Sequence, residues 1–171
     1  TPGTVLESNL LNEKKQNYLL AICRGEKVYG LAYTDISTGE FYATEISRSD
    51  LDAKLFDEAG RINPAECILP AAIYHEETLR SKLEVTAEGT ISSKVPDEYF
   101  QLKEAKNFIE KQFRVTSLDA LGLRELPLAT CAVGAILQFL METQKRDLPY
   151  LNQLKIYSPA SFMMIDSTTR R

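Results

Sequence analysis

The sequence predicts a mixed α/β domain, on the strength of three observations. Residues 17–46 form three runs rich in apolar, β-branched and aromatic side chains, and short turns at residues 24–27 and 37–39 separate them. Residues 66–70 form another short apolar run, of the kind found in a buried strand. Patterns that suit helices follow at residues 102–113 and from Pro127 onward.

The first three runs predict an antiparallel meander, because turns this short join neighbouring antiparallel strands and leave no room for a crossover. A helix is expected next. Ser49 or Asp50 is a suitable N-cap, and Gly60 is a plausible end. Leu51, Leu55 and Ala59 are expected on the buried face of this helix.

The middle of the chain predicts βα units. Residues 66–70 read as a buried strand, residues 76–82 as a helix, residues 83–87 as a strand and residues 88–98 as a surface loop. Three hairpin-linked strands followed by helix, strand, helix and strand is the order of the ribonuclease-H-like fold. We therefore expect a ribonuclease-H-like mixed sheet flanked by helices, with a helical C-terminal extension.

Two further helices are predicted in the second half. In residues 102–113 the apolar side chains recur at helical spacing, and Phe108 lies about a quarter turn away from that stripe. Pro127 is well placed as the first residue of the next helix, which is apolar nearly all round as far as Met141. This apolar half needs other elements to cover it.

Composition narrows the function classes. Of the 171 residues, 44% are hydrophobic and 26% charged, as in an ordinary globular protein, and the net charge of −4 provides no general attraction for nucleic acid. The polar start predicts no signal peptide, and no apolar run is long enough to span a bilayer. Cys23, Cys67 and Cys131 lie far apart in apolar runs, which predicts reduced thiols in a cytoplasmic protein and no metal site.

A metal-dependent nuclease is the alternative function that the fold class raises. Two-metal sites need several carboxylates at the ends of adjacent strands. The first predicted strand contains no acid, and Asp35 and Glu40 flank a turn, where solvated acids are common. Glu45 lies, with Glu40, on the third predicted strand. No catalytic residues and no metal ligands are therefore assigned.

Other catalytic patterns are weak. Ser37-Thr38-Gly39 resembles a phosphate-gripping turn but is also an ordinary turn sequence. The only histidine, His75, stands in a polar stretch, and no nucleophile is paired with it. The sequence has no P-loop motif. We expect no enzyme activity from this chain by itself.

Several short motifs, in this order and spacing, resemble the connector domain of the MutS family of mismatch-recognition proteins. They are Thr1-Pro2-Gly3-Thr4, Gly30-Leu31-Ala32-Tyr33, Ser37-Thr38-Gly39-Glu40-Phe41, Asn63-Pro64-Ala65-Glu66, Gln112-Phe113, Glu142-Thr143-Gln144 with Leu148-Pro149, and Asp166 with Thr169-Arg170-Arg171. The resemblance covers nearly the whole chain.

The resemblance implies a division into three parts. Residues 1–16 would be a linker from a mismatch-binding domain, residues 17–125 the connector domain, and residues 126–171 a helical segment that leads into the start of the core domain. The chain lacks an initiator Met and ends after Arg171, so we expect it to be a piece of a longer protein.

The resemblance also implies a function and a site. Connector domains of this family relay mismatch and ATP state between domains and dock MutL, in part through the helix that corresponds to residues 102–113. The implied partner-binding residues are Glu104, Asn107, Phe108 and Lys111. The chain departs from the family pattern at Arg114, where glycine is common, and at Asn107-Phe108, where other members can carry glutamines.

Further expectations concern cofactors and partners. The resemblance implies no cofactor in this chain, while the full-length protein would be a DNA-stimulated ATPase that binds ATP and Mg²⁺, contacts mismatched DNA and forms a homo-oligomer. No membrane partner is expected. Direct DNA contact through Lys145-Arg146 or Arg170-Arg171 is a lesser possibility. An α/β interaction module without a role in repair is a third alternative.

Overall fold

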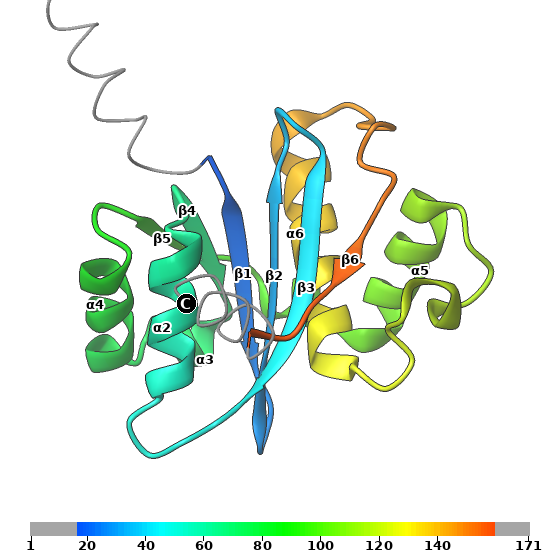
Figure 1. Ribbon diagram of the computed structural model, residues 1–171. Coiled ribbons are helices and arrows are strands. Elements are labelled where there is room, and N and C mark those ends of the chain that lie inside the picture. Colours follow the sequence, from blue (N-terminus) through cyan, green and yellow to red (C-terminus); the bar gives the residue numbers. More distant parts are fainter. Residues whose placement is uncertain (1–16, 160–171) are drawn as a thin grey trace, which may run out of the picture.

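A six-stranded mixed sheet forms the centre of the computed structural model, which describes residues 17–159 (Figure 1). Its first three strands are β1 (Leu19–Arg24), β2 (Val28–Asp35) and β3 (Glu40–Ser47). β1 pairs antiparallel with β2, and β2 antiparallel with β3. The predicted meander is confirmed.

Three more strands complete the sheet in the order β5-β4-β1-β2-β3-β6. These are β4 (Glu66–Leu69), β5 (Ile91–Lys94) and β6 (Lys155–Ile156). β4 pairs parallel with β1, β5 parallel with β4, and β6 parallel with β3. A hairpin-linked meander that continues into parallel strands, with helices on both faces, confirms the predicted fold class.

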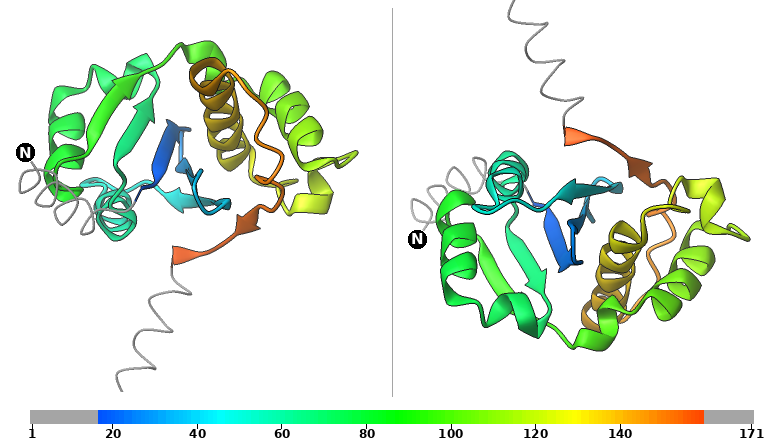
Figure 2. Two further views of the ribbon diagram at one scale, coloured as in Figure 1. Left: turned by 90° about the horizontal axis from the view of Figure 1, so that it is seen from above. Right: turned by 90° about the horizontal axis from the view of Figure 1, so that it is seen from below.

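One face of the sheet is covered by α2 (Ala53–Ile62), α3 (Ala71–Tyr74) and α4 (Glu77–Thr86). Leu20 and Ile22 of β1 point to this side, where they join a core that includes Leu55 of α2 and Leu83 of α4. Figure 2 shows these helices and the remaining ones on opposite sides of the strands. The alternation of side chains along each strand therefore separates two hydrophobic cores.

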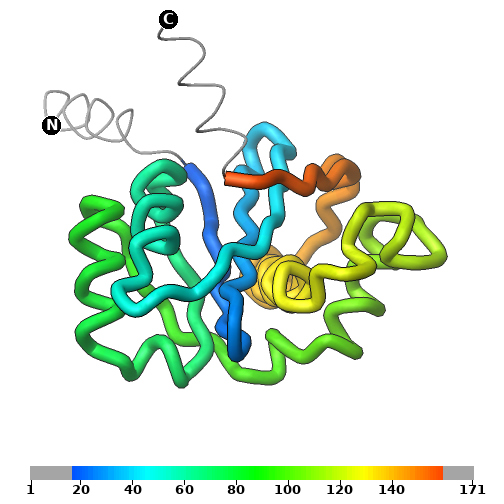
Figure 3. The backbone as a smooth tube through the Cα atoms, turned by 60° about the horizontal axis from the view of Figure 1, so that its bottom comes forward, coloured from blue at the N-terminus to red at the C-terminus, as the bar shows by residue number. Residues whose placement is uncertain are grey.

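The other face is covered by α6 (Pro127–Gln144), and α5 (Leu102–Phe113) packs on the far side of α6 (Figure 3). Short 3₁₀ turns, η1 (Asp97–Phe100) and η2 (Leu118–Leu121), flank α5. The sheet contributes small side chains here, among them Ala21, Ala32 and Ala43. Small residues allow the apolar helix to lie close to the strands.

Two glycines make these close approaches possible. A Cβ on Gly30 of β2 would lie 2.1 Å from the carbonyl oxygen of Leu128, at the start of α6. A Cβ on Gly134 of α6 would lie 2.3 Å from the Cβ of Ala105 on α5. Sheet, α6 and α5 are therefore in direct backbone-to-backbone contact at these two points, which joins them into one packed unit.

The strand predicted at residues 83–87 is wrong. α4 continues to Thr86, and the strand of this unit is β5, inside the predicted loop. Leu79 and Leu83 are buried four residues apart, whereas Val85 is 78% exposed, which is a helical and not an alternating pattern. β5 is an edge strand that contains Ser92 and Ser93, so its own residues carry little strand signal.

The predicted ends of the first helix are also wrong. α2 begins after Asp52, which lies in the left-handed region without a side-chain cap, and Gly60 lies inside the helix. Ile62 is buried and extends the apolar stripe, so it is the last helical residue, and its C-cap, Asn63, also lies in the left-handed region. Leu51, expected on the buried face, is 78% exposed.

The helices of the second half match their predictions closely. α5 has the predicted bounds, although Leu102, at the start of its expected apolar stripe, is 47% exposed. α6 begins at Pro127 as predicted, and the chain then returns along β3 as β6. Residues 1–16 and 160–171, with the motifs at Thr1-Pro2-Gly3-Thr4 and Asp166 to Arg171, lie outside the described residues. The domain boundary between residues 125 and 126 stays a prediction.

Candidate functional site

The outer face of α5 carries the four residues that the family resemblance implies for partner binding. Glu104, Asn107 and Lys111 are exposed, and Phe108 is half-buried against the core formed by α5, α6 and the sheet. Spacings of three and four residues place their side chains next to one another on one side of the helix. The helix therefore presents one partly exposed aromatic ring among polar groups.

A cleft of about 430 Å³ adjoins this face. Phe108 and Lys111 line it, whereas Glu104 and Asn107 do not. Its walls come from the second half of α5, from the end of α6 and from the segment 146–152 that follows α6. The remaining lining residues are Gln112, Phe113, Arg114, Leu137, Leu140, Met141, Arg146, Asp147, Leu148, Pro149, Leu151 and Asn152.

Gln112 fixes the third wall of the cleft. Its Nε2 donates hydrogen bonds to the carbonyl oxygens of Leu148, at 3.0 Å, and Leu151, at 2.8 Å. The side chains of Leu148 and Leu151 are buried in the core below. A single glutamine of α5 therefore ties the segment 146–152 to the helix through two hydrogen bonds.

The rim of the cleft is mainly cationic. Lys111, Arg114 and Arg146 are exposed, and Asp147 is the one acidic residue among the lining residues. Within the part of the chain that the structure describes, none of the three cations forms an ion pair. Their charges are therefore available to an anionic partner.

Arg114 occupies a special backbone position. It ends α5 with φ of 55° and ψ of 48°, in the left-handed region, and its N–H donates to the carbonyl oxygen of Glu110. Glycine adopts this conformation without steric cost, whereas arginine does not. The departure from the family pattern noted in the sequence thus places a long cationic side chain at the rim, where glycine would leave none.

Sequence reasoning missed most of the cleft. The spacing within α5 pointed to Phe108 and Lys111, but Met141 and Leu148 were not assigned to a site, and Arg146 was considered only as a possible DNA contact. In the structure the two residues of the basic pair Lys145-Arg146 have different surroundings. Lys145 Nζ lies 3.6 Å from Glu142 Oε2, whereas Arg146 lines the cleft. The motif around Leu148-Pro149 was the sequence feature that could have indicated the cleft, but only the tertiary structure places it next to α5.

The hydrogen-bond donors of the turn at residues 37–39 are engaged in hydrogen bonds to Asp35. The carboxylate of Asp35 accepts hydrogen bonds from Ser37 N, at 2.8 Å, and from Ser37 Oγ, at 2.6 Å. The amides of Thr38 and Gly39 donate to the carbonyl oxygen of Asp35. These amides are engaged within the turn, so the geometry favours the plain-turn interpretation over a phosphate grip.

Glu45 and the thiols have structural roles. Glu45 lies on β3 and hydrogen-bonds the start of α6. The Cys23 thiol donates to the carbonyl oxygen of Leu128 at 3.0 Å, and burial raises the pKa of the Cys67 thiol well above its usual value. Within residues 17–159 no group of three acidic, histidine or cysteine side chains is placed to hold a metal ion. Nor is any helix of that range long and apolar enough to cross a membrane.

Comparison with known proteins gives consistent matches. The family model of MutS domain II matches residues 17–152. The DNA mismatch repair protein MutS of Dehalococcoides mccartyi is 43% identical over 169 residues, which cover 99% of this chain and 18% of that protein. The MutS proteins of Halothermothrix orenii and Methanococcoides burtonii are 37% and 33% identical, over 99% and 100% of this chain and 18% and 19% of theirs.

The chain thus spans about a fifth of the length of the curated relatives it matches. The matched range extends from β1 to α6 and includes both α5 and the segment 146–152 that lines the cleft. The chain therefore belongs to the MutS family, and its residues 17–152 are domain II of a mismatch repair protein.

Proposed function

We propose that this chain is a connector that relays mismatch and ATP state between the other domains of a MutS protein and docks MutL through the α5 face. Glu104, Asn107, Phe108 and Lys111 would form the contact. The observation that supports this site most strongly is the half-buried Phe108, which borders both the polar face of α5 and the cleft. Aromatic side chains in such positions frequently dominate the free energy of binding.

The packing of α5 supports a docking role. Ala105 rests against Gly134 of α6, and Gln112 holds the segment 146–152. A surface that is already ordered loses little conformational entropy when a partner binds. The contact face is therefore preorganised on rigid elements.

The path of the chain supports a relay role. It enters the sheet at β1 and leaves through β6, so both connections are made to strands of one sheet (Figures 1 and 3). A packed sheet with helices on both faces transmits displacement as a rigid body. Movement imposed on one connection would reach the other without deforming the α5 face.

The proposal extends to the longer protein. Its partners would be MutL, the other MutS domains and mismatched DNA, and it would act in the cytoplasm as a homo-oligomer. ATP and Mg²⁺ would bind in a domain that this chain does not include, and the connector would bind no cofactor itself. Catalysis would then belong to the ATPase domain and not to the connector.

An NMR titration tests the docking. The isotopically labelled 171-residue chain is titrated with the ATP-bound N-terminal region of MutL. Shifts at Asn107, Phe108 and Lys111 are expected, and Phe108→Ser should weaken binding by more than about thirtyfold. Val85→Ser is the matched control, because Val85 is an exposed apolar side chain on the opposite side of the sheet.

The outcomes separate the parts of the proposal. Shifts confined to another surface would move the site away from α5. A folded Phe108→Ser variant that binds MutL normally would exclude Phe108 as the anchor. No shifts at high MutL concentration would remove docking from the function of this chain.

A further inference from the structure

The cleft beside α5 has an apolar floor, of which the proposed MutL contact uses only Phe108. Aromatic and aliphatic side chains from α5, α6 and the segment 146–152 line it: Phe108, Phe113, Leu137, Leu140, Met141 and Leu148. Met141 is 47% exposed although much of α6, the helix on which it lies, is buried. A volume of about 430 Å³ falls within the usual range of ligand pockets.

The charge of the rim contrasts with that of the chain. Lys111, Arg114 and Arg146 surround the floor, with Asp147 as the opposing charge, although the chain as a whole has a net charge of −4. The described carboxylates neutralise none of these three cations. Cations around an apolar hollow complement a ligand that is acidic at its edges and apolar at its centre.

We propose that this cleft binds an acidic segment of the docking partner, with one aliphatic or aromatic side chain buried on the floor. The inference rests on the proposed function, since it names the chemistry of the partner that docks there. The anchor packs between Phe108 and Met141, and flanking carboxylates face Lys111, Arg114 and Arg146.

A peptide fits these features better than nucleic acid does. Duplex DNA needs a continuous basic track for its phosphates, whereas this rim holds three cations and Asp147 around a hydrocarbon floor. Phosphates would leave that floor uncovered. An anchored peptide covers the floor and satisfies the rim together.

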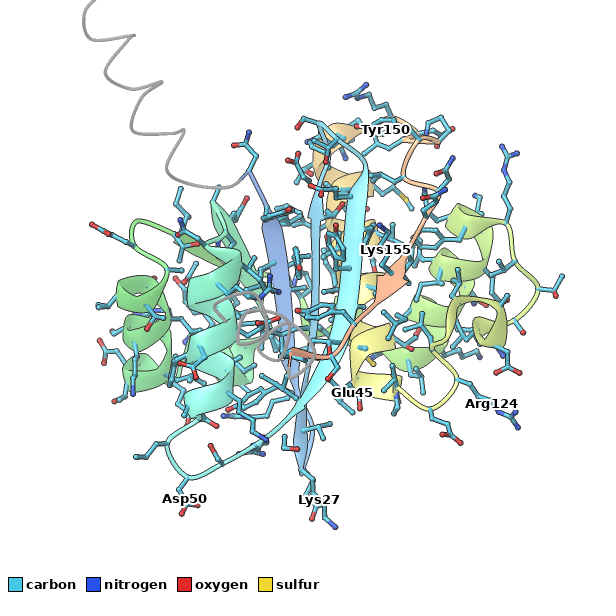
Figure 4. The ribbon with its side chains drawn as sticks, viewed as in Figure 1. Lys27, Glu45, Asp50, Arg124, Tyr150 and Lys155 are labelled. Carbon is cyan, nitrogen blue, oxygen red and sulfur yellow. The ribbon has the colours of Figure 1, made fainter. Side chains whose placement is uncertain are left out.

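Fluorescence polarisation with two probes on the 171-residue chain tests the inference. One probe is a short labelled peptide of Asp and Glu around a single Leu, and the other is the labelled ATP-bound N-terminal region of MutL. Arg114→Glu and Arg146→Glu should each weaken the binding of both probes by about fivefold, and this loss of affinity should be larger at low salt. Lys27→Glu, the same charge change at the opposite end of the sheet from Tyr150 (Figure 4), should leave both unchanged.

Two control peptides distinguish the contribution of the acidic side chains to binding from that of the buried leucine. A peptide with Asn and Gln in place of the acids should bind less tightly, and so should an acidic peptide with Ser in place of Leu. If the charge reversals leave MutL binding intact while Phe108→Ser abolishes it, the docking function stands and the acidic-segment inference is overturned. If the acidic peptide binds in the cleft and MutL does not bind the chain, the docking function fails and the recognition chemistry stands.

Two other occupants are tested in the same assay. Duplex DNA that displaces the peptide at equal concentration would overturn the inference in favour of phosphate binding. Residues 1–16 contain Leu6, Glu7, Leu10 and Glu13, so this segment has comparable chemistry. If a chain that starts at Asn17 binds the peptide more than about tenfold tighter, the segment is the occupant and a partner is not.

Discussion

Glu45 on β3 caps the start of α6: its Oε2 accepts a hydrogen bond from Leu128 N at 2.7 Å, and a second from Ala129 N at 3.2 Å (Figure 4). The residue before the helix, Leu126, has no side chain able to cap. A carboxylate from a neighbouring strand thus satisfies two free amides and interacts favourably with the positive end of the helix dipole.

Removal of this cap should destabilise the domain. We expect Glu45→Ala to lower the free energy of unfolding by about 1–2 kcal/mol, and Glu45→Gln by less, because an amide oxygen still accepts the bonds without the charge. Urea unfolding followed by circular dichroism measures both. Glu26→Ala, at the exposed β1–β2 turn, is the control. Equal stability of Glu45→Ala and Glu26→Ala would show that the cap contributes nothing.

The close contact at Gly134 should reverse a normal helix preference. Alanine in place of glycine usually stabilises a helix by about 1 kcal/mol. At Gly134 the new Cβ would lie 2.3 Å from that of Ala105, so Gly134→Ala should instead cost about 3 kcal/mol and separate α5 from α6. Gly60→Ala in α2 is the matched control, since its Cβ would lie 3.2 Å from Thr86 Cγ2 and 3.7 Å from the Thr86 carbonyl oxygen. A stabilised Gly134→Ala variant would contradict this packing.

Relief of strain at the end of α5 should stabilise the domain. Arg114 and Lys145 both end helices with φ of 55°. We expect Arg114→Gly and Lys145→Gly each to raise the free energy of unfolding by about 1 kcal/mol, because glycine adopts this conformation freely. Lys111→Gly, inside the helix, should lower it by about the same amount. Thermal unfolding compares the three variants, and a loss of stability in Arg114→Gly would rule out the strain.

Stability should fall in alkaline solution through Tyr157. Its ring lies against Tyr33 and Tyr42, and its hydroxyl donates to Glu58, which is 4% exposed. Burial, and then the negative charge of Glu58, raise the pKa of Tyr157 far above its usual value. The folded state therefore holds this proton more tightly than the unfolded state does. Its contribution is complete below about pH 10, the unfolded pKa, and declines as the pH rises further.

Tyr157→Phe tests this dependence. The variant should lose stability at neutral pH, because the hydrogen bond to Glu58 is gone, but its stability should decline less steeply above about pH 10. Tyr150→Phe removes a hydroxyl from a tyrosine that is 41% exposed and is the control. Identical slopes of unfolding free energy against pH in wild type and Tyr157→Phe would refute the assignment.

Local patterns predicted those elements whose signals lie within a few residues. The meander was predictable because its turns contain Gly25 and Gly39 and its strands are rich in apolar residues. α5 and α6 were predictable because apolar residues recur at helical spacing and Pro127 suits a first turn. The short family motifs predicted which family and which domain of that family the chain represents. For the candidate site, helical spacing already separated Phe108 from the buried stripe.

Other features depend on contacts between distant residues, so only the tertiary structure decided them. β5 is a strand because β4 offers a free edge to its backbone, although Ser92 and Ser93 carry little preference of their own. One wall of the cleft is held to α5 by Gln112, which binds the carbonyl oxygens of Leu148 and Leu151, 36 and 39 positions further along the chain. The α6 cap likewise comes from Glu45, 83 residues before Leu128.

The sequence alone thus determined the fold class, the family and the helix that carries Phe108. The tertiary structure decided which surface lies beside that helix, how its cations are arranged and which side chains hold its walls. The physical reason is that secondary structure follows the local period of apolar residues. Clefts, caps and edge strands instead depend on hydrogen bonds and packing between segments whose proximity no local pattern records.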